Sequence, residues 1–415
     1  MSFQFPSSPA DGTTFAPAGG PTYVYSGGVW KLAGGGSAFV VSSDTAPVAP
    51  FPGMLWFETD TGALYFWYVD ANSSQWVQVN FTPSSGQTAD ARNRIVNPAM
   101  QISQEVGLDA PNSAPATYVA DQWIINWATA GAPAQAVRQD TPPPNGNWFL
   151  RLGTGSTADA SVAAGDYYAA RQPLEGKRMV DFMWGTANAK PAVLRFQAKS
   201  VLAGTFCVCI RSDAGNAAFV KNCTIAANVW TDFTIPIPAC TIGTWAITAA
   251  AWGHVSFTIM AGTNINGGTD GVWMANNFQA TPACSNWMSV VGQNFEFTHV
   301  GLHLDPLATG LAPPWQMPDE AQELAACMRY WQQVITLFEG SVTSGSVFNS
   351  TGFVTVPPRG SVAISGVTLG QASFPATVGS LSFPSAVNWV TENRTASATA
   401  PRGYYRTTAT VSSRM

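Results

Sequence analysis

Few residues of this chain could do chemistry, and none is spaced as a known catalytic motif requires. The 415 residues contain no G-x-S-x-G nucleophile turn, no H-E-x-x-H pair, no Walker loop and no G-x-G-x-x-G between a strand and a helix. His299 and His303 are spaced to share one face of a helix, but the alternation of apolar residues in NFEFTHVGLHL predicts a strand. We therefore expect both histidines to be structural rather than metal ligands.

Carboxylates are present, but the sequence does not pair them. A polysaccharide-cleaving site needs two carboxyl groups within about 5 to 10 Å of each other. The candidate acids are spread through the middle of the chain: Asp159, Asp166, Glu175 and Asp181. Acids on loops are ordinarily solvated. We therefore predict that the protein is not an enzyme.

One loop has the composition of a cation site. In NINGGTDG, the residues Asn264, Asn266 and Asp270 offer oxygen atoms that could surround Ca²⁺. The loop lacks the full acidic spacing of an EF-hand, and Asn and Gly are also ordinary turn residues. A turn without metal is the favoured interpretation and a structural Ca²⁺ is the alternative. We expect no other cofactor.

Aromatic side chains are the other candidate chemistry, because an exposed aromatic face can stack on the apolar face of a sugar ring. The chain has 16 Trp, 10 Tyr and 23 Phe. Four of the tryptophans lie in alternating apolar stretches and are predicted core residues: Trp123, Trp184, Trp230 and Trp273. Six residues are candidates for an exposed sugar-binding surface, although each could be a packing residue instead: Trp252, Trp389, Arg394, Arg402, Tyr404 and Tyr405.

The composition favours β structure and argues against charged partners. Only 10% of the residues are charged, against roughly 25% in an average globular protein. The net charge of -5 is not concentrated in blocks, so neither nucleic acid nor an anionic membrane surface is an expected partner. No apolar run reaches the roughly 18 residues of a membrane helix, and MSFQFPSSPADG does not resemble a signal peptide. We expect a soluble cytoplasmic product without membrane insertion or export.

Six cysteines are too few for a disulfide framework in a chain of this length. Cys207 and Cys209 face the same side of a predicted strand but are too far apart along it to bridge comfortably. The sequence has no C-x-x-C pair. Buried free thiols are the favoured interpretation, with disulfides or a zinc site as alternatives.

The first ninety residues predict two β-hairpin units. GPTYVYSGGVWKL places a turn at Gly27-Gly28 between aromatic strands, and GALYFWYVDANSSQWVQV places a longer turn from Asp70 to Ser74. An isolated hairpin is marginally stable, so each unit is expected to pack on the other, on a second copy of the chain or on a partner. The intervening AGGGSAFVVSSDTAPVAPFPG and the later FTPSSGQTADARN are predicted linkers.

The remainder predicts two β regions separated by one helix. Residues 91–315 contain short strands divided by Gly, Pro, Asn and Ser turns, the pattern of a β-sandwich or barrel. EAQELAACMRYWQQ predicts an amphipathic helix of about four turns within 316–336, with Leu324, Met328 and Trp331 on its apolar face. The β pattern then returns in residues 337–415.

Several of these stretches resemble a family of tailed-bacteriophage tail fibres and related virion appendages. The matching stretches cover about residues 93–415: NRIVNPAMQISQE, YVADQWIINW, WGTANAKPAVLRFQAKS, TDFTIPI, FTHVGLHLDP, EAQELAACMRYWQQ and RGYYRTTATVSSRM. Separately, PGMLWFETDTGALYFWYVDANSSQWVQV resembles a short module of phage tail and collar proteins. The chain departs from the family in LAPPWQMPDEAQ, before the helix, which is richer in proline.

The resemblance implies an all-β protein with four parts. Residues 1–90 would be virion-attachment hairpin modules, 91–315 a jelly-roll sandwich similar to carbohydrate-binding modules, 316–336 a linking helix and 337–415 a small β domain. It also implies a homotrimer, with the Leu324, Met328 and Trp331 face buried against a domain or against sister chains.

The function that follows is a non-enzymatic virion appendage, assembled in the bacterial cytoplasm. Residues 1–90 would dock to other virion proteins, and the C-terminal part would bind a host-surface polysaccharide, with weak contacts made effective by avidity. One alternative is a purely structural connector or decoration protein of the tail, collar or head. A second is a polysaccharide depolymerase, such as a tailspike, or an esterase, disfavoured because no nucleophile motif is present.

Overall fold

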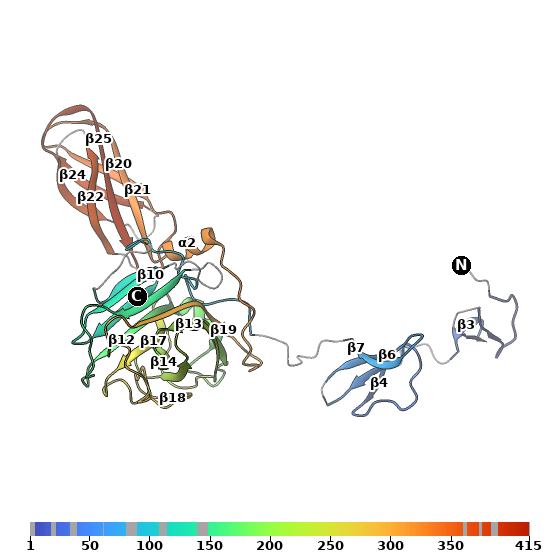
Figure 1. Cartoon of the computed structure of the whole chain (residues 1–415). Coiled ribbons are helices and arrows are strands. Elements are labelled where there is room, and N and C mark those ends of the chain that lie inside the picture. Colours follow the sequence, from blue (N-terminus) through green and yellow to red (C-terminus); the bar gives the residue numbers. More distant parts are fainter. Residues whose placement is uncertain are drawn as a thin grey trace. The chain divides into compact units, whose positions relative to one another are not determined.

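The computed structural model describes residues 5–17, 22–33, 40–60, 62–79, 89–107, 114–138, 148–359, 363–372, 376–382 and 389–414. The protein is all-β, as the sequence predicts, because strands account for nearly all of its regular structure (Figure 1). The chain divides into two compact units, residues 1–87 and 88–415, and each is described by itself. Among the described residues, no helix is long and apolar enough to cross a membrane.

The first sheet of unit 1 confirms the earlier predicted hairpin. It has the order β1-β2-β3, with β1 at Thr14–Phe15, β2 at Tyr23–Ser26 and β3 at Val29–Leu32. Gly27 and Gly28 join β2 to β3 with φ of 63° and 84°, the positive values that a tight hairpin turn requires. Phe5 stacks on Trp30 with ring centroids 5.3 Å apart. Aromatic packing thus supports a sheet too small to be stable by its hydrogen bonds alone.

The second sheet of unit 1 confirms the later hairpin and corrects the predicted linker before it. Its order is β4-β5-β6-β7, with β4 at Val40–Ser43, β5 at Leu55–Glu58, β6 at Leu64–Val69 and β7 at Ser74–Gln78. Strand β4 lies inside the predicted linker and pairs in parallel with β5. The indole N–H of Trp56 donates to the Ser43 carbonyl at 3.0 Å, which fixes the end of β4. The prediction that this whole connector is a linker is therefore wrong.

A β-sandwich forms the larger part of unit 2. One sheet has the order β10-β11-β19-β13-β16, with bounds Pro133–Arg138, Phe149–Thr154, Asn294–Leu304, Ala192–Ser200 and Thr231–Ile237. The other has the order β18-β15-β14-β17-β12-β9-β8, with bounds Val272–Met274, Ala218–Ile225, Gly204–Ser212, Ala251–Ala261, Tyr167–Glu175, Trp123–Ala128 and Thr117–Ala120. All pairings are antiparallel, and the chain passes repeatedly from one sheet to the other, as in a jelly roll.

The core of the sandwich lies between these two sheets and is rich in aromatic rings. Strands β17 and β19 are central in their sheets and are buried along almost their whole length. Phe257 of β17 and Phe297 of β19 stack across the core with centroids 4.2 Å apart, and Trp123 packs edge-on against Phe297. All six cysteines are free thiols, and Cys284 alone among them is not fully buried.

The helix α2 is shorter than predicted. It spans Glu320–Met328, and the Asp319 side chain caps it by accepting the Gln322 N–H at 3.0 Å. The chain then turns and enters β20, Trp331–Val342. The prediction of a helix to residue 336 is wrong. Trp331 already belongs to a strand, where it pairs with Ser412 of the last strand in the sequence, β25 (Ala400–Ser412).

The three residues predicted to form one apolar helix face differ in their placement within the chain. Leu324 is 37% exposed, Met328 is half-buried, and Trp331 is buried but lies on the strand β20. Contact of this face with sister chains stays a prediction. The buried residue of α2 is Cys327, which packs with Val96, Ile102 and Tyr330. The contact with the sandwich is therefore made by a different side of the helix from the one predicted.

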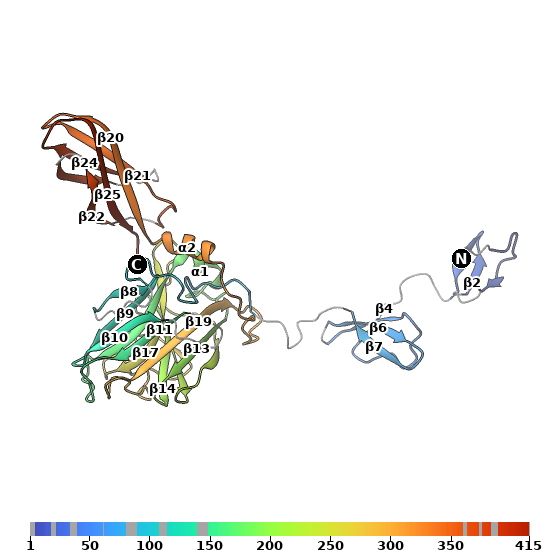
Figure 2. The same ribbon diagram turned by 45° about the horizontal axis from the view of Figure 1, so that its top comes forward.

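The last sheet has the order β22-β25-β20-β21-β24-β23 and extends beyond α2 (Figures 1 and 2). Its other strands are β21 at Val347–Phe353, β22 at Ala363–Ala372, β23 at Ala376–Ser382, β24 at Trp389–Ala396 and β25 at Ala400–Ser412. One face is buried, with Val334, Val390 and Val411 in its apolar part. On the same face, Glu392 forms an ion pair with Arg394, and its carboxylate accepts a hydrogen bond from Thr407 at 2.6 Å.

Side-chain contacts join the sandwich to this last sheet. The guanidinium of Arg329 donates two hydrogen bonds to the buried Glu175 carboxylate, at 3.0 and 2.7 Å, and the Tyr330 hydroxyl donates to it at 3.2 Å. Arg359 donates to the Ala249 carbonyl. Because Glu175 and Ala249 flank the walls of a pocket in the sandwich, these contacts connect those walls to the last sheet.

Candidate functional site

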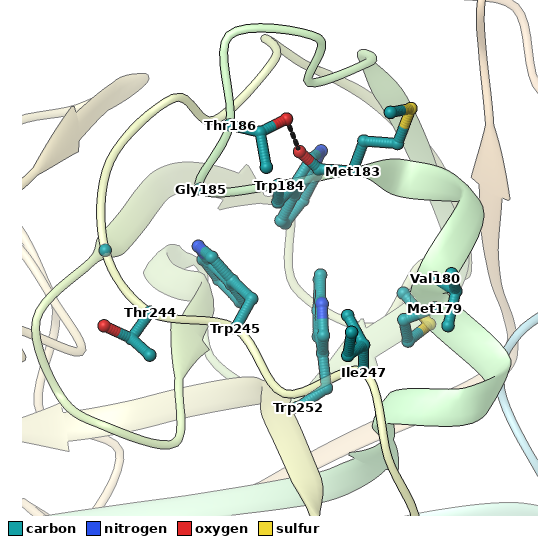
Figure 3. Close-up of a pocket in the computed structure, with 11 residues that line it drawn as sticks. Met179, Val180, Met183, Trp184, Gly185, Thr186, Thr244, Trp245, Ile247 and Trp252 are labelled. Carbon is teal, nitrogen blue, oxygen red and sulfur yellow. Dashed lines mark hydrogen bonds between the residues drawn. The ribbon is translucent and has the colours of Figure 1, made fainter.

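A pocket of about 400 Å³ lies where the end of β12 meets the loop that leads into β17 (Figure 3). Its first wall is built by α1, Gly176–Met179, the 3-10 turn η1, Val180–Phe182, and the residues that follow. From this wall, Met179, Val180, Met183, Trp184, Gly185 and Thr186 line the pocket. The second wall belongs to the loop before β17 and the start of that strand, and contributes Gly243, Thr244, Trp245, Ile247 and Trp252.

Two glycines let the walls approach each other. Gly185 has φ of 80° and donates its N–H to the Cys240 carbonyl at 2.8 Å. A Cβ at Gly185 would lie 2.8 Å from the Gly243 carbonyl oxygen and 2.9 Å from Trp245 Cδ1, closer than real Cβ contacts allow. Gly243 also has a positive φ, 79°. Trp-Gly-Thr at 184–186 and Gly-Thr-Trp at 243–245, which contain the same three residue types in a different order, therefore lie against each other at the pocket.

The other end of the walls is held by backbone hydrogen bonds. Gly176 donates to the Ala250 carbonyl at 2.9 Å, and Lys177 donates to the Thr248 carbonyl at 2.8 Å. A Cβ at Gly176 would lie 2.4 Å from the Ala246 carbonyl oxygen. The short helix α1 thus lies directly against the loop, and backbone hydrogen bonds tie the two walls together.

Three indoles form one side of the pocket (Figure 3). The ring centroids of Trp245 and Trp252 are 4.2 Å apart, those of Trp184 and Trp252 4.8 Å, and those of Trp184 and Trp245 5.1 Å. The indole N–H of Trp184 donates to the Lys190 carbonyl at 2.7 Å, and that of Trp245 donates to Ile242 at 2.9 Å. The rings are consequently fixed in orientation before any ligand arrives.

The pocket has an apolar rim and no ionisable side chain in its lining. Val180 is 48% exposed, Met183 38% and Ile247 67%. The hydroxyls of Thr186 and Thr244 are the polar side-chain groups of the lining. None of the eleven residues that line this pocket is a general acid, a general base or a charged nucleophile.

The structure does not bring the six predicted sugar-binding residues into one surface. Trp252 lines the pocket, but its side chain is only 2% exposed. Arg394 and Tyr405 are 3% and 2% exposed, so the prediction of an exposed site at these positions is wrong. Both side chains lie on the buried face of the last sheet, where the Arg394 guanidinium carbon is 4.6 Å from the Tyr405 ring centroid.

The other three predicted positions are spread over the last sheet. Tyr404 is 48% exposed, on the face opposite to that of Tyr405. Trp389 begins β24 and Arg402 lies in β25, but their side chains fall outside the part of the chain that the structure describes.

Sequence reasoning missed most of the pocket. It placed Trp123 and Trp184 in the core, and both are buried, whereas Trp230 and Trp273 are only half-buried. It did not single out Trp245, and it gave no role to the threonines beside Trp184 and Trp245. The available signal was the pair of tripeptides Trp-Gly-Thr and Gly-Thr-Trp, since both contain one Trp, one Gly and one Thr.

The loop with the three candidate calcium ligands is held by hydrogen bonds to neighbouring residues. Asp270 accepts a hydrogen bond from the Lys221 ammonium at 2.8 Å and another from the Asn222 N–H at 2.7 Å. The Asn266 side-chain amide donates to the Ala261 carbonyl at 3.1 Å, and the Asn264 N–H donates to the Ala164 carbonyl at 2.9 Å. Among the described residues, no group of three His, Cys, Asp or Glu side chains could hold a metal ion.

The candidate carboxylates are likewise engaged in structural contacts. Asp159 accepts from the Thr129 hydroxyl at 2.6 Å, and Asp166 accepts from the Ala163 N–H at 2.7 Å. Asp181 pairs with the buried Arg94 at 2.8 Å. Together with the Glu175 contacts above, each of these carboxylates has a role in holding loops or strands.

The histidines are buried and uncharged. His299 stacks on Trp315 with centroids 4.3 Å apart, and His303 Nδ1 lies 2.9 Å from the Asp90 carbonyl oxygen. Burial lowers the pKa of each to about 4. Both act as packing residues of β19 near neutral pH, which agrees with their expected structural role.

Comparison with known proteins gives only distant likenesses. No protein-family model and no curated protein matches the chain. Among solved structures, the enzymatically active domain of bacteriophage CBA120 tailspike protein 4 matches with 13% identity and a TM-score of 0.28 over 51% of this chain and 21% of that chain. The family 11 carbohydrate-binding module from Clostridium thermocellum, in complex with a mixed-linked tetrasaccharide, matches with 14% identity and a TM-score of 0.25 over 49% and 98%.

A cyclase from Fischerella sp. TAU matches with 10% identity and a TM-score of 0.31 over 54% and 100%. The chain spans about a fifth of the tailspike chain that it matches. At these identities and TM-scores, the likenesses identify neither the family nor the activity of this protein.

Proposed function

We propose that the protein is a non-enzymatic virion appendage of a tailed bacteriophage that binds a host-surface glycan through the pocket of its β-sandwich. The observation that carries this proposal is the pocket of about 400 Å³, whose exposed apolar rim of Val180, Met183 and Ile247 surrounds a cluster of largely buried indoles. An apolar rim can contact the apolar face of a sugar ring, and ordered walls reduce the entropic cost of binding.

The phage assignment rests on the sequence stretches that resemble tail fibres and tail or collar modules. In this proposal, unit 1 docks to other virion proteins. Exposed apolar side chains in its second sheet and the adjoining loop support a docking role: Val48 is 99% exposed, Phe51 52% and Phe57 37%. Clustered exposed apolar residues commonly mark protein contacts.

The proposed assembly is a homotrimer. The outward face of the last sheet carries Ile335 and Leu337 on β20 and Val347 and Phe353 on β21, which are 43%, 60%, 68% and 71% exposed. These residues share one side of the sheet. Leu337 pairs with Thr351, and Thr351 is an even number of residues from Val347 and Phe353 along β21, so all of them point to the same face. Contact between copies would cover this face and would make several weak sugar sites act together.

The test uses the full chain, intact candidate host cells and soluble surface polysaccharide as competitor. Ile247→Asp places a charge on the exposed rim of the pocket, and Val291→Asp is the matched control. Val291 is 54% exposed in the turn before β19, at the other end of the strands from the pocket. We expect binding that the polysaccharide competes, loss of about tenfold or more in affinity with Ile247→Asp, and no change with Val291→Asp.

Equal binding by both variants would remove the pocket from the proposal. A folded chain that binds no cells would favour the structural connector. Shortening of the polysaccharide by the pure protein would favour the depolymerase.

A further inference from the structure

Two arginines and a histidine meet on the outer face of the seven-stranded sheet, in which β14, β17 and β12 are neighbours (Figure 1). Arg211 of β14 pairs with His254 of β17, and Arg171 of β12 pairs with Ser256 of β17. Paired residues point to one face, and so do residues two apart along a strand. This face is turned away from the core, because Val255, between His254 and Ser256, packs in the core. His254 therefore lies between the two arginines, directly opposite one and diagonal to the other.

Neutral groups hold both guanidinium groups in place. Arg211 Nε donates to His254 Nε2 at 3.1 Å, and Arg211 Nη1 donates to the Asn277 carbonyl at 3.3 Å. The side-chain carbonyl of Asn126, in the amide orientation that satisfies both groups, accepts from Arg171 Nε and Nη2 at 3.0 and 3.2 Å. Within the part of the chain that the structure describes, no carboxylate lies within 4.0 Å of either guanidinium. Two ordered positive charges thus share one face without a carboxylate partner from these residues.

The two charges are close enough to act on each other and on the histidine. Burial is the main cause that lowers the pKa of Arg211, and the charge of Arg171 also lowers it. Burial, and then the charges of Arg211 and Arg171, lower the pKa of His254 well below its ordinary value. The imidazole is therefore neutral near pH 7. Like charges side by side on a sheet are destabilising, so folding alone does not explain this arrangement.

Three N–H groups on this face are left for an external ligand. Because His254 Nε2 accepts from Arg211, its Nδ1 carries the hydrogen. Among the described residues, Arg171 Nη1, Arg211 Nη2 and His254 Nδ1 have no hydrogen-bond partner. Both arginines are half-buried, and their charges are screened less by salt than fully exposed ones. Such guanidinium groups bind carboxylates and phosphates through charge-assisted hydrogen bonds.

We propose that Arg171 and Arg211 bind the anionic group of an acidic sugar, a carboxylate or a phosphate ester, on the outer face of the seven-stranded sheet. His254 and Asn126 are the positioning residues of this site. Nucleic acid is disfavoured, because it needs a longer basic surface than one pair of arginines in a chain of net charge -5. The inference goes beyond the proposed function, since none of these residues lines the pocket.

The first experiment compares ligands that differ in charge. Titration calorimetry measures the binding of α-1,4-linked trigalacturonic acid to the full chain beside its fully methyl-esterified form, in which the carboxylates are neutral esters. Glucose 6-phosphate and glucose form the corresponding phosphate pair. We expect the charged member of at least one pair to bind about tenfold or more tightly than the neutral member. The pair that shows this preference identifies the anionic group as carboxylate or phosphate.

Two double variants assign the preference to this face. Arg171→Gln combined with Arg211→Gln removes both charges, so the affinity for the charged ligand should fall to about that for the neutral one. Arg92→Gln combined with Lys177→Gln is the matched control, because it removes the same charge at exposed positions elsewhere, and should keep the preference. Circular dichroism and thermal melts of both variants check that the fold is retained.

Equal affinity for the charged and neutral members of both pairs would overturn the inference, as would absence of binding to either anion at millimolar concentration. A folded Arg171→Gln, Arg211→Gln chain that keeps the preference would also overturn it. If that variant does not fold, the comparison of charged and neutral ligands on the wild-type chain still decides the question. Cell binding that is sensitive to Ile247→Asp would leave the proposed function standing even if neither anion binds.

Discussion

The side chain of Asn97 holds the segment that precedes the first strand of the sandwich. It is fully buried and has φ of 51°, in the left-handed region. Its amide donates to the Ile102 and Asp121 carbonyls at 2.7 and 3.1 Å and accepts from the Ile102 N–H at 3.1 Å. Its own N–H donates to Glu323 of α2 at 2.6 Å. Asn is one of the few residues that tolerates this backbone conformation.

Replacement of Asn97 should therefore be severe. Asn97→Ala removes the side-chain partner of the Ile102 N–H and of the Asp121 carbonyl, whereas the Ile102 carbonyl keeps the Asp121 N–H at 2.9 Å. The variant also keeps a strained backbone, so we expect a loss of about 2–4 kcal/mol in the free energy of unfolding. Urea denaturation of unit 2, followed by tryptophan fluorescence, measures it. Asn188→Ala, at an exposed position, is the control and should change stability by less than about 0.5 kcal/mol.

At the residue scale, the buried tryptophans could be predicted and the pocket could not. Alternation identified Trp123 and Trp184 as inward-facing, because the strand period is two. Arg394 and Tyr405 were predicted to be exposed and are buried. They follow the same alternation, because their neighbours in sequence point to the opposite face of the sheet. A charge inside a sheet is unusual, and only the structure shows that Glu392 neutralises Arg394 there.

The boundary of α2 illustrates what local pattern leaves open at the element scale. Residues 331–336 fit the apolar spacing of a helix and the alternation of a strand. The choice is made by β25, which pairs with β20 from more than sixty residues further along the chain. Local sequence does not contain that partner. The same reason explains β4, whose parallel pairing with β5 a linker-like composition conceals.

The Arg329 to Glu175 ion pair is a prediction at this scale, because it joins the end of α2 to the end of β12. Glu175 has a fully buried side chain. Burial alone would raise its pKa, but hydrogen bonds and the positive charge of Arg329 outweigh burial, and the pKa is lowered. Arg329→Met strands a buried carboxylate and should lower the free energy of unfolding of unit 2 by about 2–4 kcal/mol near pH 7.

The pH dependence distinguishes this charge effect from lost packing. Because the folded-state pKa of Glu175 is lowered, its contribution is present above the ordinary glutamate value of about 4.3 and is lost as the pH falls through the lowered value. Without Arg329 the pKa of the buried Glu175 is higher than in the wild type. The difference in stability between wild type and Arg329→Met should therefore narrow as the pH falls through the variant's higher pKa, and should be smallest below the lowered pKa of the wild type. Lys177→Met, at an exposed position on α1, is the control and should show no such dependence. A difference that stays constant with pH would assign the loss to packing.

At the scale of the whole molecule, the exposed face of the last sheet should set the oligomeric state. Leu337→Lys combined with Val347→Lys introduces positive charges on strands β20 and β21 without touching the buried face. We expect the proposed trimer to dissociate, with the molar mass from light scattering falling to that of one 43.9 kDa chain. Thr269→Lys, at an exposed position of the sandwich, is the control. A wild-type chain that is already monomeric would contradict the trimer.

Much of the molecular plan follows from the sequence. Turn residues and alternation located the two hairpins of unit 1 and the strand-rich middle region, because these signals are local. The order of strands in the sheets is not local, and neither is the meeting of two short Gly-Thr segments about sixty residues apart. Pocket formation depends on that long-range meeting, which is why no short motif revealed it.

The position of β25 has a consequence for synthesis. It is the last strand of its sheet to be made, yet it lies between β22 and β20 and pairs with both. Until residues 400–412 have left the ribosome, β20 and β22 each lack that partner and expose backbone hydrogen-bonding groups that can pair with other chains. Translation that stops before Ala400 would therefore yield a product with a finished sandwich and an adhesive, incomplete sheet, which quality-control proteases should remove.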